Sequence, residues 1–435
     1  MFANIFASIV IWGIALVCVF QILMESGCLS RKGNFCQILH RKKTKFPACA
    51  PTKFDFLKIF VFAGVFRVAC FLLSYLVLYL FNANDGSYPI ENTINEWLKW
   101  DANNYIRIAT LDYDGYIETN GMYSTLVFFP LYSWIIRFVL LFFQNPGTAA
   151  LIAASLCYML GCCYLFGFVS LEYGKRIAWK SVLLISIFPF SFFLGAMMPE
   201  STFLFVASAC LYYTKKHKWP LVALFGILAA LSRMQGVLLF VPAFLEWMIA
   251  YKPFRMIQKK QWKLFRSVCF SKLMWLPLIG IGTLIYLWEN YRVTGDAFYF
   301  LKCQEAIWNQ HAQYFGKTIE NLWTYAMTDH VQDFSKVAIW IPQLVIFIFA
   351  CVVLVYGVRR HKPQYTCFLL LYTVMNYTPS WLLSAGRYMT VAIPMYFILA
   401  EWLDKKPKLW SAILVIFSML FSVYMWGFLQ WRQIF

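Results

Sequence analysis

Long apolar runs alternate with short polar or basic connectors along nearly the whole chain. A helix needs about 20 apolar residues to cross roughly 30 Å of hydrocarbon. The runs lack the alternating apolar and polar positions of a barrel strand. Helices are then the element that can satisfy all backbone hydrogen bonds inside a membrane. The pattern predicts transmembrane helices at residues 2–24, 57–81, 148–171, 181–197, 201–214, 219–232, 234–250, 273–289, 338–358, 364–383, 389–403 and 409–427.

One further apolar stretch, residues 127–143, does not fit as a crossing. An acidic loop precedes this stretch, and Asn145-Pro146-Gly147 follows it. These two flanks must lie on the same side of the membrane if all the basic connectors further along the chain are to lie on the opposite side. Pro130 near its start and Arg137 in its middle suit a re-entrant or interfacial helix. The predicted fold class is therefore all-α: a polytopic integral membrane protein with about 12 transmembrane helices and one helix that does not cross.

Composition agrees with this class, because 61% of the 435 residues are hydrophobic and only 13% are charged. The net charge of +18 could suggest a nucleic-acid partner. The basic residues, however, gather in short connectors, as the positive-inside rule expects, so we predict no nucleic-acid partner. We expect one membrane domain over residues 1–435, and these connectors on the cytoplasmic side: 25–56, 251–272, 175–176, 215–216, 359–360 and 405–406.

The loop at residues 82–124 has the opposite charge, with seven acidic residues against two basic ones, and should face outside. It contains the polar run Trp100-Asp101-Ala102-Asn103-Asn104-Tyr105. A carboxylate held where membrane meets water is costly unless it is used, which makes Asp101 a candidate functional residue. The alternative is that Asp101 only caps a short helix over residues 102–110.

A second outer loop, residues 290–337, brings aromatic and amide side chains together. Gln304, Trp308 and His311 have the spacing of one helix face, and Asn309 lies beside them. An aromatic platform with amide donors suits a sugar ring and its hydroxyl groups. An interfacial aromatic anchor explains the same residues without a ligand.

Three charged residues occupy the outer ends of short, broken apolar segments: Glu200, Arg233 and Arg387. Helices broken by polar residues often line a water-filled cavity. Arg387, between Gly386 and Tyr388 at the start of an apolar run, could hold a phosphate by paired hydrogen bonds. Snorkelling to the membrane surface is the competing explanation for all three.

The thirteen cysteines do not indicate a disulfide framework, since most fall inside apolar spans. Cys28, Cys36, His40 and Cys49 match no common zinc-ligand spacing. We therefore predict no metal site from the spacing of these residues.

Five short motifs occur in one order: Trp100-Asp101, Phe128-Phe129-Pro130-Leu131-Tyr132, Ser232-Arg233-Met234-Gln235-Gly236, Gln304 to Asn309, and Gly386-Arg387-Tyr388. This order resembles the GPI mannosyltransferase 2 family, also called PIG-V, which has bacterial relatives. The resemblance spans about residues 60–401. It implies a GT-C glycosyltransferase with a GT-C-type helical bundle, which transfers a sugar from a polyprenyl-phosphate donor to a glycan or glycolipid acceptor on the non-cytoplasmic face. It also implies that Asp101, in the first outer loop, is the catalytic carboxylate.

The chemistry of such a transfer assigns further roles. Inversion at the anomeric carbon needs a base for the acceptor hydroxyl, which we predict to be Asp101, with Glu200 orienting the acceptor. The departing lipid phosphate needs cations, and Arg387, Arg233 and Arg107 are the candidates. The remaining predicted substrate contacts are Trp100, Asn104, Tyr105, Gln304, Trp308, Asn309 and Tyr388. Some enzymes of this general fold use a divalent cation, but the sparse outer carboxylates give no clear ligand set, and no cofactor is predicted.

Loops without a glycosylated lumenal domain favour a bacterial plasma-membrane enzyme over one of the endoplasmic reticulum. The extra first span and the lone sequon at Asn376 depart from the eukaryotic pattern of the resembled family. The alternative function is a transporter or flippase for a lipid-linked or small polar substrate, since broken helices with charges also describe transporters. A transporter would keep its loops short, whereas two outer loops here are long, which favours the enzyme.

Overall fold

The computed structural model describes residues 2–28, 48–82, 88–118, 121–328 and 333–430, with residues 432 and 434. All regular elements in these ranges are helices, and the extended pairing they contain is one bridge between Ala312 and Pro379. This confirms the all-α prediction. Within the described residues, seven helical segments are long and apolar enough to cross a membrane: α1 (Phe2–Glu25), α3 (Lys53–Asn82), α7 (Pro146–Tyr173), Met234–Gln258, Trp262–Thr294, Asp333–Val358 and α22 (Pro407–Leu429).

Shorter helices occupy the other predicted spans. They are α8 (Lys175–Ile187), α9 (Glu200–Lys215), α10 (Trp219–Ser232), α19 (Pro363–Asn376) and α21 (Ile393–Leu403). Two predicted ends, at residues 197 and 383, are wrong, because α8 ends at Ile187 and α19 at Asn376. Pro189 and Pro379 follow these ends, and a proline disfavours helical geometry in the residue before it.

The stretch at residues 127–143 forms α6 (Pro130–Leu140), which packs against α7 and against α5 (Ala102–Leu111). Eleven residues span roughly 16 Å as a helix, too short to cross the hydrocarbon layer. Arg137 donates hydrogen bonds of 2.8 and 2.9 Å to the carbonyl oxygens of Ile108 and Ala109. Its charge therefore caps the last turn of α5.

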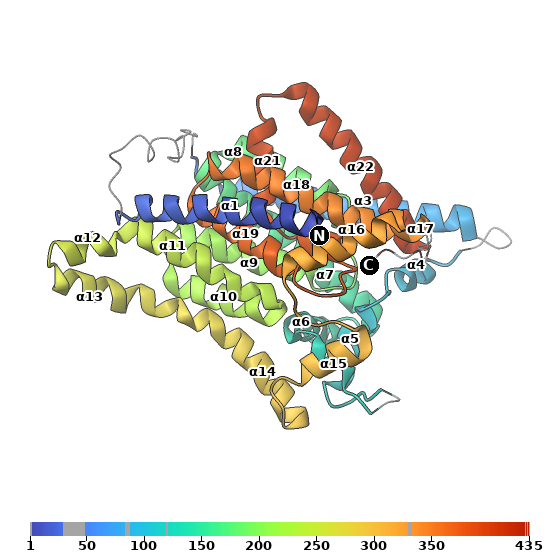
Figure 1. Ribbon diagram of the computed structural model, residues 1–435. Coiled ribbons are helices and arrows are strands. Elements are labelled where there is room, and N and C mark those ends of the chain that lie inside the picture. The colour runs from blue at the N-terminus through green and yellow to red at the C-terminus, as the bar shows by residue number, and fades with distance from the viewer. Residues whose placement is uncertain are drawn as a thin grey trace.

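The two ends of the molecule differ in charge. Figure 1 shows α12 (Pro253–Gln258) and α13 (Trp262–Ser271) at one end, and α4 (Ile90–Glu96) and α5 toward the other. Ion pairs join the basic connectors to one another: Glu172 accepts from Lys215 at 2.7 Å and from Lys362 at 2.9 Å. Lys215 of one predicted connector and Lys362, next to another, therefore meet at one carboxylate. Residues 29–47 of the first connector lie outside the described residues.

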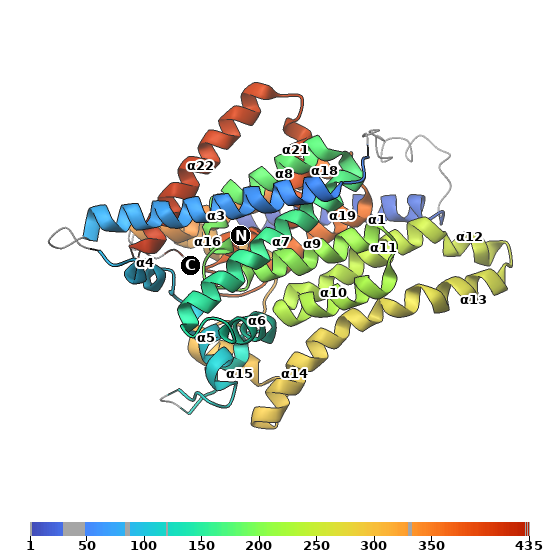
Figure 2. The ribbon, with the colours of Figure 1, turned by 180° about the vertical axis from the view of Figure 1, so that it is seen from behind.

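Packing separates buried helices from helices with one exposed apolar face. Figure 2 shows α3 lying over α7, which contacts α9 on another side. The α7 interface is built of small residues such as Ala150 and Ala153, which let backbones approach closely. Val61, Val65 and Leu72 of α3 are exposed on the face away from this core, as expected for contact with lipid tails.

A glycine pair in the segment Trp262–Thr294 offers a test of this packing. A Cβ atom at Gly282 would overlap the carbonyl oxygen of Ile227 in α10, whereas a Cβ atom at Gly280 would meet nothing within 4 Å. Gly282→Ala should lower the stability by about 1–3 kcal/mol through overpacking, and Gly280→Ala should leave it nearly unchanged. Thermal unfolding in detergent measures both variants, and equal melting temperatures would contradict the close approach of α14 (Ile281–Thr294) to α10.

Candidate functional site

Four charged side chains from four separate segments meet at the end of the molecule that carries α4 and α5. Asp101 precedes α5, Glu200 begins α9, Arg233 follows α10, and Arg387 lies in α20 (Ala385–Met389). We call these four residues the charge cluster. Arg387 lies at its centre, with Nη1 2.8 Å from Asp101 Oδ2 and Nε 2.8 Å from Glu200 Oε1. Arg233 Nη1 donates to the same Glu200 oxygen at 3.0 Å.

Asp101 occupies the N-cap position of α5, but its side chain makes no capping hydrogen bond. Its carboxylate instead accepts a hydrogen bond from Arg387. The alternative of helix capping therefore does not account for the Asp101 side chain. Trp100, the residue before it, has a φ of 54°, a left-handed conformation that costs a non-glycine residue roughly 1–2 kcal/mol. The backbone is thus strained next to the candidate carboxylate, as is common at functional sites.

Burial excludes snorkelling as the explanation of the other three charges. The side chains of Glu200, Arg387 and Arg233 are 0%, 5% and 8% exposed. Glu200 follows Pro199 at the start of α9, where a negative charge interacts favourably with the helix dipole. Both arginines contact this one carboxylate, which makes Glu200 the shared counter-ion of the cluster.

Tyr388 and Gly386 hold Arg387 in place from either side along the chain. The guanidinium groups of Arg233 and Arg387 lie 4.7 and 5.2 Å from the Tyr388 ring centre, which adds cation–π attraction. A Cβ atom at Gly386 would meet the Phe190 ring at 2.9 Å, so only glycine lets α20 come this close. Burial alone would lower the pKa of Arg387, but the charges of Glu200 and Asp101 outweigh it and raise that pKa well above its ordinary value.

Aromatic contacts connect the charge cluster to the second predicted loop. Tyr105 of α5 is buried, and its ring lies 5.2 Å from that of Phe128. The Phe128 ring lies 6.0 Å from Trp308, the last residue of α15 (Tyr299–Trp308). Burial raises the pKa of Tyr105 well above its ordinary value, and the charges of Glu200 and Asp101 raise it further. Trp308 and Tyr105 therefore belong to one continuous aromatic contact that reaches the cluster.

The rest of the second loop differs from the prediction in one respect. Gln304 and Trp308 are both half-buried on α15, but the helix ends there, and Asn309 is an exposed left-handed residue with a φ of 50°. His311 is therefore not on the same helix face. It lies in an extended segment, where its carbonyl oxygen accepts a 2.9 Å hydrogen bond from Ser380 N.

Three residues predicted to contact the substrate, Asn104, Arg107 and Trp100, are not part of the charge cluster. Asn104 Oδ1 accepts a 3.3 Å hydrogen bond from Arg107, and the Arg107 guanidinium stacks 3.9 Å from the centre of the Tyr116 ring. Arg107 thus pairs within its own loop, while Trp100 is half-buried beside Asp101.

A buried cation in the middle of α3 was missed by the sequence prediction. The Arg67 guanidinium lies 5.6 Å from the Trp97 ring and 5.9 Å from the Tyr158 ring, and it fills the space where a side chain at Gly195 would lie. An arginine inside a predicted span is a signal of function by itself, and this one could have been singled out. Among the residues that the structure describes, no group of three His, Cys, Asp or Glu side chains could hold a metal ion. Cys36 and His40 lie outside that part of the chain.

Neutralising Glu200 tests whether it holds the cluster together. Glu200→Gln keeps the shape of the side chain but leaves Arg233 without its carboxylate partner and leaves Arg387 with Asp101 alone. It should lower the stability by about 3 kcal/mol, since a buried charge without its partner is strongly destabilising. The control is Glu305→Gln, at an exposed position of α15. Equal melting temperatures of the two variants in detergent would show that Glu200 is not the shared counter-ion.

Residues 129–280 match the sequence profile of the dolichyl-phosphate-mannose-protein mannosyltransferase family. This segment holds Glu200 and Arg233. No curated protein matches the chain. Among solved structures, ArnT from Cupriavidus metallidurans is 15% identical with a TM-score of 0.44, and the match covers 78% of this chain and 63% of ArnT.

The archaeal oligosaccharyltransferase AglB from Archaeoglobus fulgidus, solved with an inhibitory peptide and a dolichol-phosphate, is 12% identical with a TM-score of 0.41. That match covers 87% of this chain and 55% of AglB, so the chain spans less than two thirds of either protein. The profile match supports a membrane glycosyltransferase without singling out the GPI mannosyltransferase 2 family. The similarity that the profile shows is thus confined to residues 129–280 and to the dolichyl-phosphate-mannose-protein mannosyltransferase family.

Proposed function

We propose that this protein is an inverting membrane glycosyltransferase that moves a sugar from a polyprenyl-phosphate donor to an acceptor hydroxyl, with Asp101 as the base. The observation that carries the proposal is the ion pair between Asp101 and Arg387 at 2.8 Å. It places a proton acceptor and a phosphate-binding cation side by side, and the transfer requires both. The match of residues 129–280 to a family named for dolichyl-phosphate-mannose supports the lipid-linked donor.

Asp101 is the member of the cluster that suits a base. Its side chain is 26% exposed, whereas that of Glu200 is fully buried. A base must reach the acceptor hydroxyl, and a carboxylate enclosed by two arginines cannot. We therefore assign Glu200 the role of a positioning residue that holds Arg387 and Arg233, in place of the contact with the acceptor predicted from sequence.

The charge balance of the cluster suggests how the donor would bind. The two arginines of the cluster are balanced by two carboxylates. A donor phosphate can therefore form an ion pair with one of the arginines only by displacing a carboxylate from it. Asp101, the more exposed of the two, is the one that a phosphate would replace at Arg387. The exchange would give the phosphate a bidentate partner and release Asp101 to accept the acceptor's proton.

The aromatic contact of Trp308 with Phe128 and Tyr105 supports a sugar site next to Asp101. In this proposal Trp308 offers the apolar platform, and Gln304 and Asn309 bond to sugar hydroxyls. Trp100, Asn104 and Tyr388 complete the predicted substrate contacts. Mannose as the sugar, a glycan or glycolipid as the acceptor, and the bacterial plasma membrane as the location remain parts of the proposal.

Asp101→Asn tests the base directly. Because Asp101 is partly exposed and Arg387 keeps Glu200 as a counter-ion, the amide should preserve the fold, whereas loss of the base should reduce the transfer rate roughly 10²–10⁴-fold. The assay incubates purified protein in lipid nanodiscs with labelled polyprenyl-phosphate-mannose and a panel of glycan and glycolipid acceptors. The control is Asp114→Asn, in the same loop, with a side chain 57% exposed.

Two outcomes would count against this proposal. A near wild-type rate for Asp101→Asn would remove Asp101 as the base. If the wild-type protein transfers no sugar from any polyprenyl-phosphate donor, a transporter or flippase becomes the better explanation.

Arg387→Lys tests the phosphate contact. Lysine keeps the charge but lacks the planar fork that contacts Asp101 and Glu200 together, so the KM for the donor should rise at least about tenfold while the KM for the acceptor stays within about twofold. The matched control is Arg359→Lys, which is exposed at the opposite end of the molecule. An unchanged donor KM would assign Arg387 a structural role only.

A further inference from the structure

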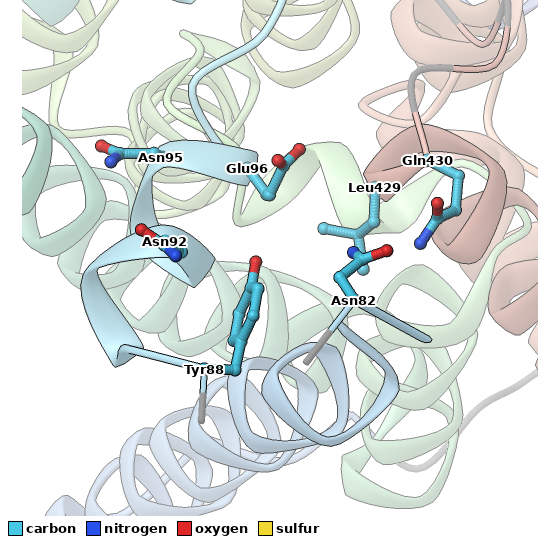
Figure 3. A pocket seen from close by; sticks show the side chains of 7 residues that line it. All are labelled: Asn82, Tyr88, Asn92, Asn95, Glu96, Leu429 and Gln430. Carbon is cyan, nitrogen blue, oxygen red and sulfur yellow. The ribbon is translucent and has the colours of Figure 1, made fainter. Parts of the chain in front are cut away.

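A second candidate site lies on the same end of the molecule, outside the charge cluster. A pocket of about 400 Å³ opens where the C-terminal ends of α3 and α22 meet α4. Its polar lining consists of Asn82, Tyr88, Asn92, Asn95, Glu96 and Gln430, and Leu429 adds an apolar wall. In Figure 3 the Tyr88 hydroxyl, the Glu96 carboxylate and the amides of Asn82 and Gln430 face a common space.

The amide groups of this pocket are free for a ligand. Within the described part of the chain, the side chains of Asn82, Asn92, Asn95 and Gln430 make no hydrogen bond, and Gln430 Nε2 is buried without a partner. A buried donor left unpaired costs roughly 1–3 kcal/mol. A ligand that offers an acceptor to Gln430 would recover that cost.

The pocket carries no free charge. Glu96 is the single ionic group of its lining, and its carboxylate lies 2.6 Å from the Lys99 ammonium. Lys99 is fully buried and also donates to the carbonyl oxygens of Phe428 and Leu429 at the end of α22. The lining thus offers neither a cation for a phosphate nor an unpaired carboxylate for a cation. Its ligand should be neutral and rich in hydroxyl groups.

We propose that this pocket binds a neutral saccharide. Four amides and a phenol supply donors and acceptors for hydroxyl groups, and the Tyr88 ring supplies an apolar face. The volume lies within the roughly 300–1,000 Å³ of small-ligand sites and is enough for one or two sugar rings.

The chain connects this pocket to the proposed catalytic residue. Glu96 is the last residue of α4, and Lys99 lies in the short segment that leads from α4 to Asp101. The pocket would therefore hold the sugar portion of the acceptor, a step that rests on the proposed function. Saccharide binding itself does not depend on catalysis.

Gln430→Met separates binding from stability. The substitution conserves volume and removes the unpaired amide, so the melting temperature should stay the same or rise. Affinity for a neutral mannose oligosaccharide, measured by calorimetry on the full chain in detergent, should fall at least about tenfold. The matched control is Gln258→Met, at an exposed position of α12 at the opposite end.

A second binding experiment asks whether the saccharide is free or attached to a lipid. It measures binding of a neutral glycolipid to the protein in nanodiscs. Binding of the free oligosaccharide indicates recognition of the sugar alone, and binding of the glycolipid only indicates a lipid-anchored acceptor. Equal affinity of wild type and Gln430→Met for both ligands, or no binding of either by wild type, would overturn the proposal.

The two proposals can fail separately. Asp101→Asn should bind the saccharide as wild type does, because saccharide binding does not need the base. If the wild-type protein binds the saccharide but transfers no sugar from any donor, the proposed function fails and the pocket stands. Conversely, transfer with an acceptor KM that Gln430→Met does not change would keep the enzyme and reject the pocket as its acceptor site.

Discussion

The guanidinium group of Arg387 is the contact on which the candidate site depends. It joins the segment before α5 to the start of α9, and Glu200 then ties in the end of α10 through Arg233. Each buried ion costs several kcal/mol to desolvate, so this arrangement is tolerable only because every charge meets an opposite one. Well-packed apolar residues would often stabilise such a site as well or better, which makes stability a poor reason for the cluster.

Polar contacts at the opposite end fix the helices that carry this cluster. Glu172, at the end of α7, accepts from Lys215 at the end of α9, and also from the Tyr365 hydroxyl of α19 at 2.6 Å. Glu246, in α11 (Phe240–Tyr251), accepts from Gln364 Nε2 at 2.6 Å. Helix α9 is therefore held near both ends, by Lys215 at one and by Glu200 at the other, and this limits how far Glu200 can move away from Arg387.

Hydropathy predicted the helices because a membrane span is a local property of about twenty residues. It placed the ends of α8 and α19 too far along the chain. Mean hydropathy over a window of residues does not detect a helix end that a proline imposes, as Pro189 and Pro379 do here. The charged residues of the site were also identifiable, as ionisable groups at the ends of apolar runs. Their pairing was not, because Asp101 and Arg387 are 286 positions apart and no local pattern specifies such a contact. The choice between capping and ion pairing at Asp101 likewise needed coordinates.

Burial divides the roles within the cluster. The exposed fraction rises from Glu200, at 0%, through the two arginines to Asp101, at 26%. A fully buried carboxylate can set the position of its partners but cannot exchange them, because leaving a guanidinium group unpaired in the interior is too costly. A partly exposed carboxylate can exchange its partner, since water or a ligand replaces the lost contact. In the proposed function, the same chemical group therefore serves as a fixed counter-ion at Glu200 and as an exchangeable one at Asp101, and only the second would take part in the reaction cycle.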